Sequence, residues 1–158
     1  MSKYQLAQLN VAVMLAPIDS PVMSDFVANV DRINALAATS DGYIWRFTDP
    51  NEKALAKNVF QEQYLLTNMS VWASQSALFN FTYHSDHLAI YKRKKEWFQK
   101  MKTMHMVFWF IPEGGYPSLK EAKLRLDYLN AHGETPHAFT FKSKFTPADL
   151  EAYTPVDM

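Results

Sequence analysis

The chain has 158 residues, with equal numbers of basic (Lys and Arg) and acidic (Asp and Glu) side chains and no Cys. A chain of this length forms about one domain and buries roughly 70% of its unfolded surface, so it needs neither a disulfide nor a metal to hold its fold. The zero net charge excludes a strong field that attracts nucleic acid or a membrane surface, and the absence of Cys excludes thiolate catalysis and Cys-ligated metal sites.

The N-terminal segment, residues 1–5, lacks the apolar run of a signal peptide, and no segment approaches the roughly 18 uninterrupted apolar residues of a membrane span. We therefore expect a cytoplasmic protein with neither a membrane nor nucleic acid as a partner. Aromatic residues make up 15% of the chain, which is more than a core of this size requires and favours an interface or an apolar pocket.

The first half of the chain predicts strands and helices in alternation. Residues 4–14 mix β-branched and aliphatic residues with amides, as strands do. Ser20 and Pro21 open a helix whose apolar residues recur at spacings of three and four as far as Ala37. Two further strands are predicted at 43–48 and 64–72. The residues between them, 49–63, are predicted to form a loop with a short helical piece.

The second half predicts a long helical region, a strand and a last helix. The helical region starts at Ser74 and ends near Phe98, with a break at 83–85. The apolar run 105–111 has the length of a strand. A capping box at 118–121 opens a helix that Gly133 ends.

The C-terminal segment predicts an extended arm. Three Phe residues share one parity along a last strand or extended stretch: Phe139, Phe141 and Phe145. We assign residues 1–145 to a single domain and residues 146–158 to a C-terminal arm docked on its surface. The element order β-α-β-β-α-β, followed by an extra helix, is that of a ferredoxin-like split βαβ domain, an α+β fold with an antiparallel sheet.

Strand parity divides the side chains between the two faces of the predicted sheet, because residues two apart in a strand share a face. The purely apolar set should meet the helices: Leu9, Val11, Val13, Leu65, Met69, Val71, Met106, Phe108 and Phe110. The second set mixes amides, a hydroxyl and an imidazole with two indoles: Gln8, Asn10, Asn68, Ser70, Trp72, His105, Val107 and Trp109. This mixture predicts a semi-polar cavity closed by a second sheet, with a simple dimer interface as the alternative.

Motifs along most of the chain also carry a family resemblance. They are the segments 8–12, 42–46, 68–72, 83–87, 93–98, 121–126 and 138–141. From about Tyr4 to Phe145 the chain resembles a family catalogued only as a domain of unknown function. That family is similar to the dimeric α/β-barrel proteins, which include antibiotic-biosynthesis and haem-degrading monooxygenases. The resemblance implies a homodimer in which two ferredoxin-like subunits pack sheet against sheet and enclose pockets.

Candidate site residues follow from the parity, the histidines and this resemblance. Cofactor-independent monooxygenation needs a base, a pocket that excludes water and donors for a developing oxyanion. The candidate catalytic residues are Asn10, Arg46, His84 and His87. The candidate ligand-binding residues are Asn68, Ser70, Trp72, His105 and Trp109. Each has a structural alternative, as a core residue, a strand-edge partner or one half of an ion pair.

The two histidines also bear on cofactors. His84 and His87 share a helical face if the helix is continuous, but they form no metal-binding motif, and we predict no metal. Haem-degrading relatives use an Asn that Asn10 matches, and a Trp that falls at Phe81. Their His falls near Tyr91 unless a gap brings it to His87. No cofactor is predicted, while haem binding through His84 or His87 stays open.

A basic run at 92–95, with Lys100 and Lys102, spreads around a helix and is expected to be a solvated face. The leading expectation is therefore a small-molecule enzyme or binder with a semi-polar, aromatic-lined pocket. Its most concrete version is a monooxygenase-like enzyme acting on a hydrophobic or aromatic substrate. The alternatives are a haem-binding protein and a non-catalytic dimerisation or interaction module.

Overall fold

The apolar and alternating segments of the chain form one open, antiparallel sheet in the computed structural model, which describes residues 3–49, 51–62 and 64–156. The strands are β1 (Tyr4–Val13), β2 (Tyr43–Arg46), β3 (Leu65–Trp72) and β4 (Met106–Pro112). Their order in the sheet is β2-β3-β1-β4, and every neighbouring pair is antiparallel. The sheet is thus of the ferredoxin-like type expected from the element order.

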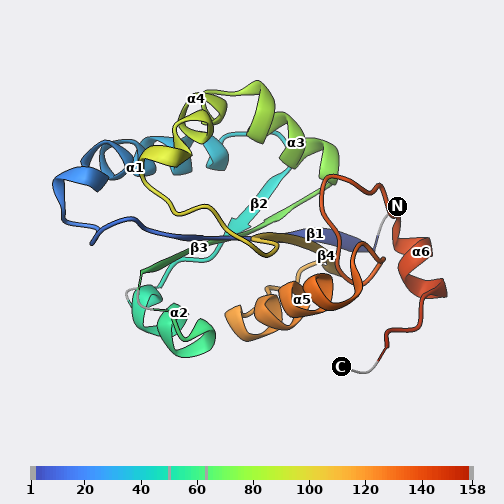
Figure 1. Cartoon of the computed structure of the whole chain (residues 1–158). Helices are drawn as coiled ribbons and strands as arrows, with labels where there is room; N and C mark the ends of the chain where they lie inside the picture. Colours follow the sequence, from blue (N-terminus) through green and yellow to red (C-terminus); the bar gives the residue numbers. More distant parts are fainter. Residues whose placement is uncertain (1–2, 50, 63, 157–158) are drawn as a thin grey trace.

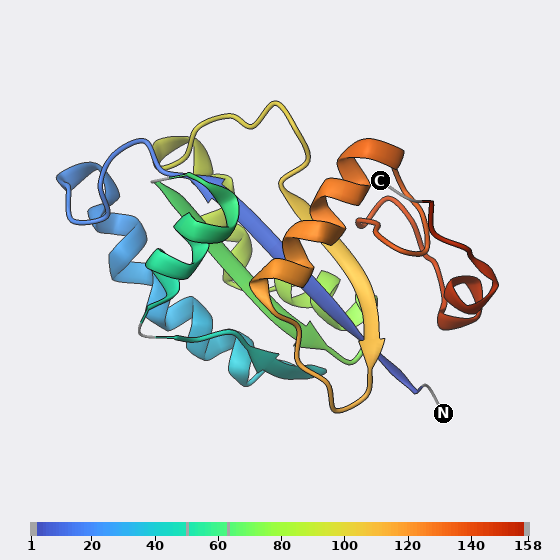
Figure 2. The same ribbon diagram turned by 90° about the horizontal axis from the view of Figure 1, so that it is seen from below.

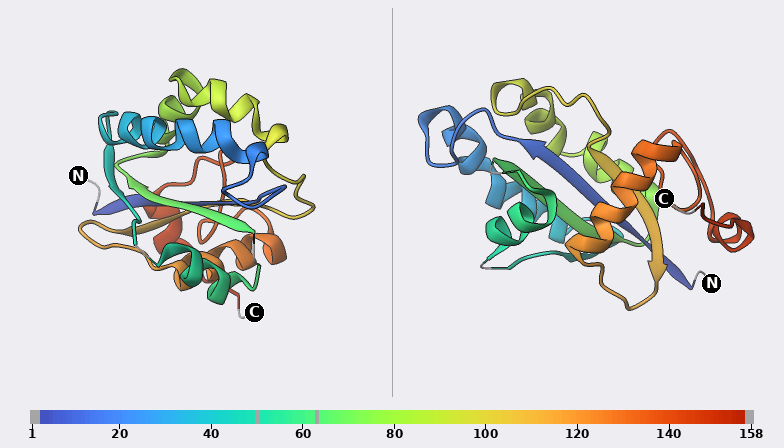
Figure 3. Two further views of the ribbon diagram at one scale, coloured as in Figure 1. Left: turned by 90° about the vertical axis from the view of Figure 1, so that its left-hand side faces the viewer. Right: turned by 60° about the horizontal axis from the view of Figure 1, so that its bottom comes forward.

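Helices cover both faces of this sheet. The α-helices are α1 (Ser24–Ala38), α2 (Glu52–Phe60), α3 (Gln75–His84), α4 (His87–Lys92), α5 (Leu119–His132) and α6 (Pro147–Ala152). Two short 3-10 helices are named η1 (Pro21–Met23) and η2 (Lys94–Glu96). Helices α1, α3 and α4 lie on one side, here called the α3 face (Figure 1). Helices α2 and α5 lie on the other, the α5 face (Figures 1 and 3). No helix in the described ranges is both long and apolar enough to cross a membrane.

Local signals set most helix ends. The Ser74 hydroxyl accepts a hydrogen bond from the Ala77 N–H at the start of α3, and the Ser118 hydroxyl accepts one from the Glu121 N–H at the start of α5. The predicted break in the long helical region is confirmed, because Ser85 adopts an extended backbone between α3 and α4. Ser20 differs from expectation: its side chain makes no capping bond, and a 3-10 turn precedes α1.

A tight turn places the start of α3 against strand β2. Gly42 has φ of +83°, and its carbonyl accepts a 2.7 Å hydrogen bond from the Ala73 N–H. A Cβ on Gly42 would lie 2.4 Å from the Cβ of Ala77. Glycine is therefore required here both for its backbone conformation and for the close approach of the helix.

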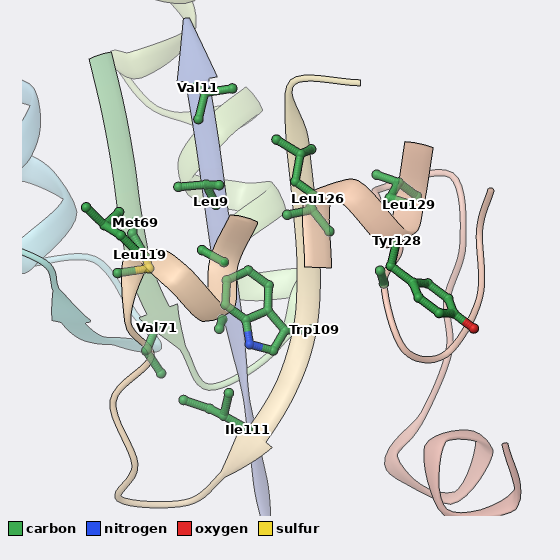
Figure 4. Packing of buried hydrophobic residues seen from close by; sticks show 14 of the residues in the cluster. Leu9, Val11, Met69, Val71, Trp109, Ile111, Leu119, Leu126, Tyr128 and Leu129 are labelled. Carbon is green, nitrogen blue, oxygen red and sulfur yellow. The ribbon is translucent and has the colours of Figure 1, made fainter. Parts of the chain in front are cut away.

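The α5 face holds the largest apolar cluster, part of which Figure 4 shows. Its labelled members are Leu9, Val11, Met69, Val71, Trp109, Ile111, Leu119, Leu126, Tyr128 and Leu129. The faces predicted for the side chains of β4 from strand parity are wrong. Phe108 pairs with Gln8 across the ladder, whereas Trp109 pairs with Ala7, so the Trp109 ring joins the α5 face. Alternation within a strand separates its side chains into two sets, but it does not show which set lies on which face of the sheet. The pairing register with the neighbouring strand decides this.

The α5 face is covered from within the same chain. Segment 49–63 contains a full helix, α2, rather than a short helical piece, and its Ala56 is buried in the cluster with Leu119 and Leu126 of α5. Trp109 is completely buried. The exposed tryptophan-bearing face that motivated a sheet-to-sheet dimer is therefore absent from the described chain.

The C-terminal segment packs along β4 and α5, as Figure 2 shows from below. Phe139 forms an isolated antiparallel bridge with Phe108 rather than part of a last strand, and the two backbone hydrogen bonds are 2.7 and 3.0 Å. Beyond α6, the Tyr153 hydroxyl bonds to the Tyr128 hydroxyl, which also accepts a bond from the Val156 N–H. These contacts hold the arm on the surface of α5.

Candidate functional site

The α3 face carries a row of polar side chains across three strands. In the ladder Gln8 of β1 lies opposite Ser70 of β3, and Ser70 lies opposite Arg46 of β2. The next pair towards the far end of the sheet is Asn10 with Asn68. Residues that pair across antiparallel strands share a face, so the register itself brings these five side chains to one side.

A buried hydrogen-bond network organises this polar row. Gln8 Nε2 donates to Ser70 Oγ at 2.7 Å and to Asn68 Oδ1 at 2.8 Å, and Trp72 Nε1 donates to the same Ser70 oxygen at 2.8 Å. Gln8 and Ser70 are each only 5% exposed, and Trp72 is 1% exposed. Polar groups this deeply buried are costly unless they are paired, so the network fixes the orientation of each member.

The polar row opens towards solvent at one end. Asn68 is exposed although its strand is an inner one, and its cross-strand partner Asn10 is half-buried. Within the described residues the Asn10 amide makes no side-chain hydrogen bond. A free amide beside an exposed amide, between the two apolar clusters of this face, can donate hydrogen bonds to a bound molecule.

A series of contacts between aromatic rings connects this row to α4. The Trp72 ring stacks on Phe81 with centroids 5.3 Å apart, and Phe81 lies 5.0 Å from the imidazole of His87. His87 in turn lies 6.2 Å from the ring of Tyr91. All of these rings except Trp72 are only half-buried, so this is an aromatic surface and not a closed core.

The hydrogen bonding of His87 fixes its tautomer. Nδ1 lies 3.1 Å from the carbonyl oxygen of Thr82, and because a carbonyl only accepts, Nδ1 carries the proton. Burial lowers the pKa of His87 below its ordinary value, and the bond to Thr82 offsets part of this effect. The neutral ring therefore presents Nε2 as a lone-pair acceptor, and Nε2 has no hydrogen-bond partner among the described residues.

The other predicted site residues are placed differently. His84 is the exposed last residue of α3, with its ring 5.7 Å from Phe79. His105 is exposed and precedes β4, and Trp109 lies on the opposite face of the sheet. The helix break at Ser85 separates His84 from His87, so the two do not share one helical face.

Arg46 shares the face but not the network. It is half-buried on the edge strand, and within the described residues no hydrogen bond joins its side chain to Gln8 or Ser70. Its charge acts on Glu52 instead. Burial raises the pKa of Glu52, and Arg46 lowers it in part. In the described ranges no three His, Asp or Glu side chains are grouped as a metal site requires.

Four members of the site are missing from the predicted site residues: Gln8, Phe81, Thr82 and Tyr91. Gln8 is central to the network, and its parity with Asn10 and its amide were the available signals. Thr82 contributes only a backbone carbonyl, which no sequence pattern marks. Asn68, Ser70 and Trp72, by contrast, are brought together as their shared parity predicts.

A Ser70→Ala variant tests the network. It leaves the buried Trp72 N–H without an acceptor, so the free energy of unfolding should fall by about 1–3 kcal/mol. Urea unfolding measures this loss. In a Trp72→Phe background the same change should matter less, because that donor is already gone. An equal loss in both backgrounds would show that the indole bond contributes nothing.

Comparison with known proteins gives one family. A family model described as "Domain of unknown function (DUF3291)" matches residues 5–154. No curated protein matches the chain. Among solved structures, the crystal structure of PA3566 from Pseudomonas aeruginosa is similar at 13% sequence identity and a TM-score of 0.46, covering 73% of this chain and 98% of that one.

Proposed function

We propose that this chain, which belongs to the DUF3291 family of domains of unknown function, binds a small aromatic molecule with a weakly acidic hydroxyl and takes the proton of that hydroxyl at His87. The family membership agrees with the resemblance found in the sequence. The relation to the dimeric α/β-barrel proteins and their monooxygenases stays a prediction.

The state of His87 is the observation that carries this proposal. A neutral imidazole whose Nδ1–H is held by Thr82 has its lone pair fixed on Nε2, which makes it a hydrogen-bond acceptor and a base. The ring stands beside the half-buried rings of Phe81 and Tyr91. An aromatic ligand can pack against the exposed edges of such half-buried rings with its hydroxyl directed at the imidazole.

The polar row supports the same function. Asn10 and Asn68 are the amides that open to solvent, and they are suited to donate hydrogen bonds to a polar group of a bound ligand. Gln8 and Ser70 hold Asn68 and Trp72 in place, and Trp72 holds Phe81 by stacking. Trp72 therefore acts as a positioning residue beneath the ligand rather than as its stacking partner.

The most concrete reaction for such a site is oxygenation by O₂ itself. Removal of the hydroxyl proton of α-naphthol gives an electron-rich anion, whose para carbon forms a bond to O₂. Loss of water from the resulting hydroperoxide then leaves a naphthoquinone. One α-naphthol and one O₂ give one naphthoquinone and one water, so the substrate supplies all the electrons.

The test uses α-naphthol and variants at position 87. His87→Asn keeps an N–H donor for the Thr82 carbonyl but removes the base, and we expect it to raise the dissociation constant about three- to tenfold. Quinone formation, followed by absorbance and O₂ consumption, should fall at least about a hundredfold. His84→Ala is the matched control, and it should leave both the dissociation constant of α-naphthol and the rate of quinone formation unchanged.

The pH dependence gives an independent check. Burial lowers the pKa of His87, so Nε2 is free at neutral pH and becomes protonated only as the pH falls through a value below about 6.5. The dissociation constant of α-naphthol should rise about three- to tenfold in that same range, as it does in His87→Asn. A midpoint above 6.5, or one that persists in His87→Asn, would contradict the role of His87.

Haem binding is the second candidate, since an axial His ligand binds iron through a nitrogen that carries no proton, as Nε2 of His87 does. Hemin added to the protein should then give a Soret band that His87→Ala abolishes and His84→Ala retains. With Phe81 in place of the Trp of the degrading enzymes, the bound haem should survive a reductant. If no band appears, the cofactor-independent proposal is favoured.

A non-catalytic interaction module is the rival from another class. It would bind neither α-naphthol nor hemin, although its fold and its buried network would be unchanged. A homodimer also stays a prediction. Because α2 and α5 cover one face and α1, α3 and α4 the other, a dimer of this chain would use surfaces other than two bare sheets.

A further inference from the structure

A lysine stands at the edge of the proposed site. Lys94 belongs to η2, directly after α4, and its Nζ lies 4.3 Å from the centroid of the Tyr91 ring and 3.2 Å from the Tyr91 hydroxyl. Tyr91 is also the ring next to His87. One aromatic side chain therefore separates the ammonium of Lys94 from the imidazole.

The charge of Lys94 is not compensated. Its neighbour Arg93 is paired with Asp25 and with Glu96, both at 2.7 Å, and these two pairs use the nearby carboxylates. Across the described residues no carboxylate lies within ion-pair distance of Lys94. Four further exposed lysines surround it on the same stretch: Lys92, Lys95, Lys100 and Lys102. Although the whole chain is neutral, this corner of it is positive.

The hydrogen bond between Lys94 and Tyr91 leaves two donors side by side. An ammonium only donates, so the Tyr91 oxygen accepts from Lys94. Burial raises the pKa of Tyr83, and a hydrogen bond from its hydroxyl to Tyr91 raises it further, so the Tyr91 oxygen accepts from Tyr83 as well and its own O–H proton is left to donate elsewhere. The remaining N–H groups of Lys94 are likewise free. Two adjacent donors, one of them charged, match the two oxygens of a carboxylate.

We propose that Lys94 and Tyr91 bind a carboxylate of the ligand, so that the molecule taken by the His87 site is a hydroxyaromatic acid. This inference rests on the proposed function and narrows its substrate class. The hydroxyl meets Nε2 of His87, the ring lies against Tyr91 and Phe81, and the carboxylate projects to Lys94. Lys94 is a specificity residue in this arrangement, because it acts on the end of the ligand that does not react.

The experiment compares two probes that differ by one group. The first is α-naphthol, and the second is α-naphthol with a carboxylate on its second ring. Ligand fluorescence gives both dissociation constants. The wild type should bind the carboxylate probe about three- to tenfold more tightly, and added salt should reduce this preference.

Variants test which residues cause the tighter binding of the carboxylate probe. Lys94→Met should remove it while leaving the affinity for α-naphthol unchanged, and Lys94→Arg should keep most of it. Tyr91→Phe should remove part of it. Lys100→Met is the matched control, since it deletes a nearby exposed charge, and it should behave as wild type. Circular dichroism melting curves verify that each variant is folded.

The outcomes separate this inference from the proposed function. If α-naphthol binds and the carboxylate probe binds no more tightly, the carboxylate site is wrong while the His87 site stands. If Lys94→Met and Lys100→Met reduce the preference equally, the assignment to Lys94 is wrong, because only the general charge of the stretch matters. If neither probe binds to the wild type, both proposals fail.

Discussion

A Trp109→Ala variant is expected to lose about 3–5 kcal/mol of unfolding free energy. The ring is fully buried between the sheet and α5, among Leu119, Leu126 and Ile111 (Figure 4). Its removal leaves a cavity that the surrounding strands and helix cannot close without distortion. Urea unfolding followed by far-ultraviolet circular dichroism measures the loss.

Trp109→Phe is the matched control for that prediction. It keeps an aromatic ring in the cluster and removes only the outer part of the indole. The indole N–H is buried without a hydrogen-bond partner among the described residues, so its removal leaves no broken bond behind. We therefore expect a clearly smaller loss than for Ala. An Ala variant that lost less than about 1 kcal/mol would contradict the burial of this ring under α5.

A Gly42→Ala variant is expected to lose about 2–5 kcal/mol of unfolding free energy. The new Cβ is unfavourable in two ways: the backbone at φ of +83° disfavours an L side chain, and the Cβ would lie 2.4 Å from that of Ala77. Either the turn or the start of α3 must move. Thermal and urea unfolding of the purified variant report the change.

Gly114→Ala separates these two causes. Gly114 has the same φ of +83°, but nothing lies within 4 Å of the Cβ that would be added. This control should therefore show only the backbone effect, about 1–2 kcal/mol. Adding Ala77→Gly to Gly42→Ala should recover part of the excess loss. If the Gly42 and Gly114 variants were equally stable, the close approach of α3 to the turn would be excluded.

Sequence patterns predicted most elements of the fold but not how the strands meet. Alternation identified β1, β3 and β4, yet it placed Phe108 and Trp109 on the wrong faces, since only the pairing of Phe108 with Gln8 fixes the register. Helix α2 was underestimated for a related reason. Among its described residues Ala56 is buried, Val59 and Phe60 pack partly against the cluster, and Leu55 stays 38% exposed. The segment is also rich in polar and charged residues, so the sequence alone predicted no more than a short helical piece.

For the candidate site, too, the sequence predicted which residues of one strand lie together but not which tertiary contacts they make. The shared parity of Asn68, Ser70 and Trp72 sufficed to group them. The choice between His84 and His87 depends on where the helix breaks and on the position of the Phe81 ring between those of Trp72 and His87. Those are tertiary contacts, which no local spacing encodes.

The bond between His87 and Thr82 also has a consequence for how this position should be interpreted in relatives. The last carbonyls of a helix lack backbone partners, and at the end of α3 the Phe81 carbonyl accepts from the Ser85 hydroxyl while the Thr82 carbonyl accepts from the His87 ring. The imidazole thus serves as a helix C-cap. A relative that carries out no chemistry at this position would still benefit in stability from a ring N–H donor here. A histidine at this position is therefore evidence of the helix end first, and evidence of activity only when Nε2 faces a ligand.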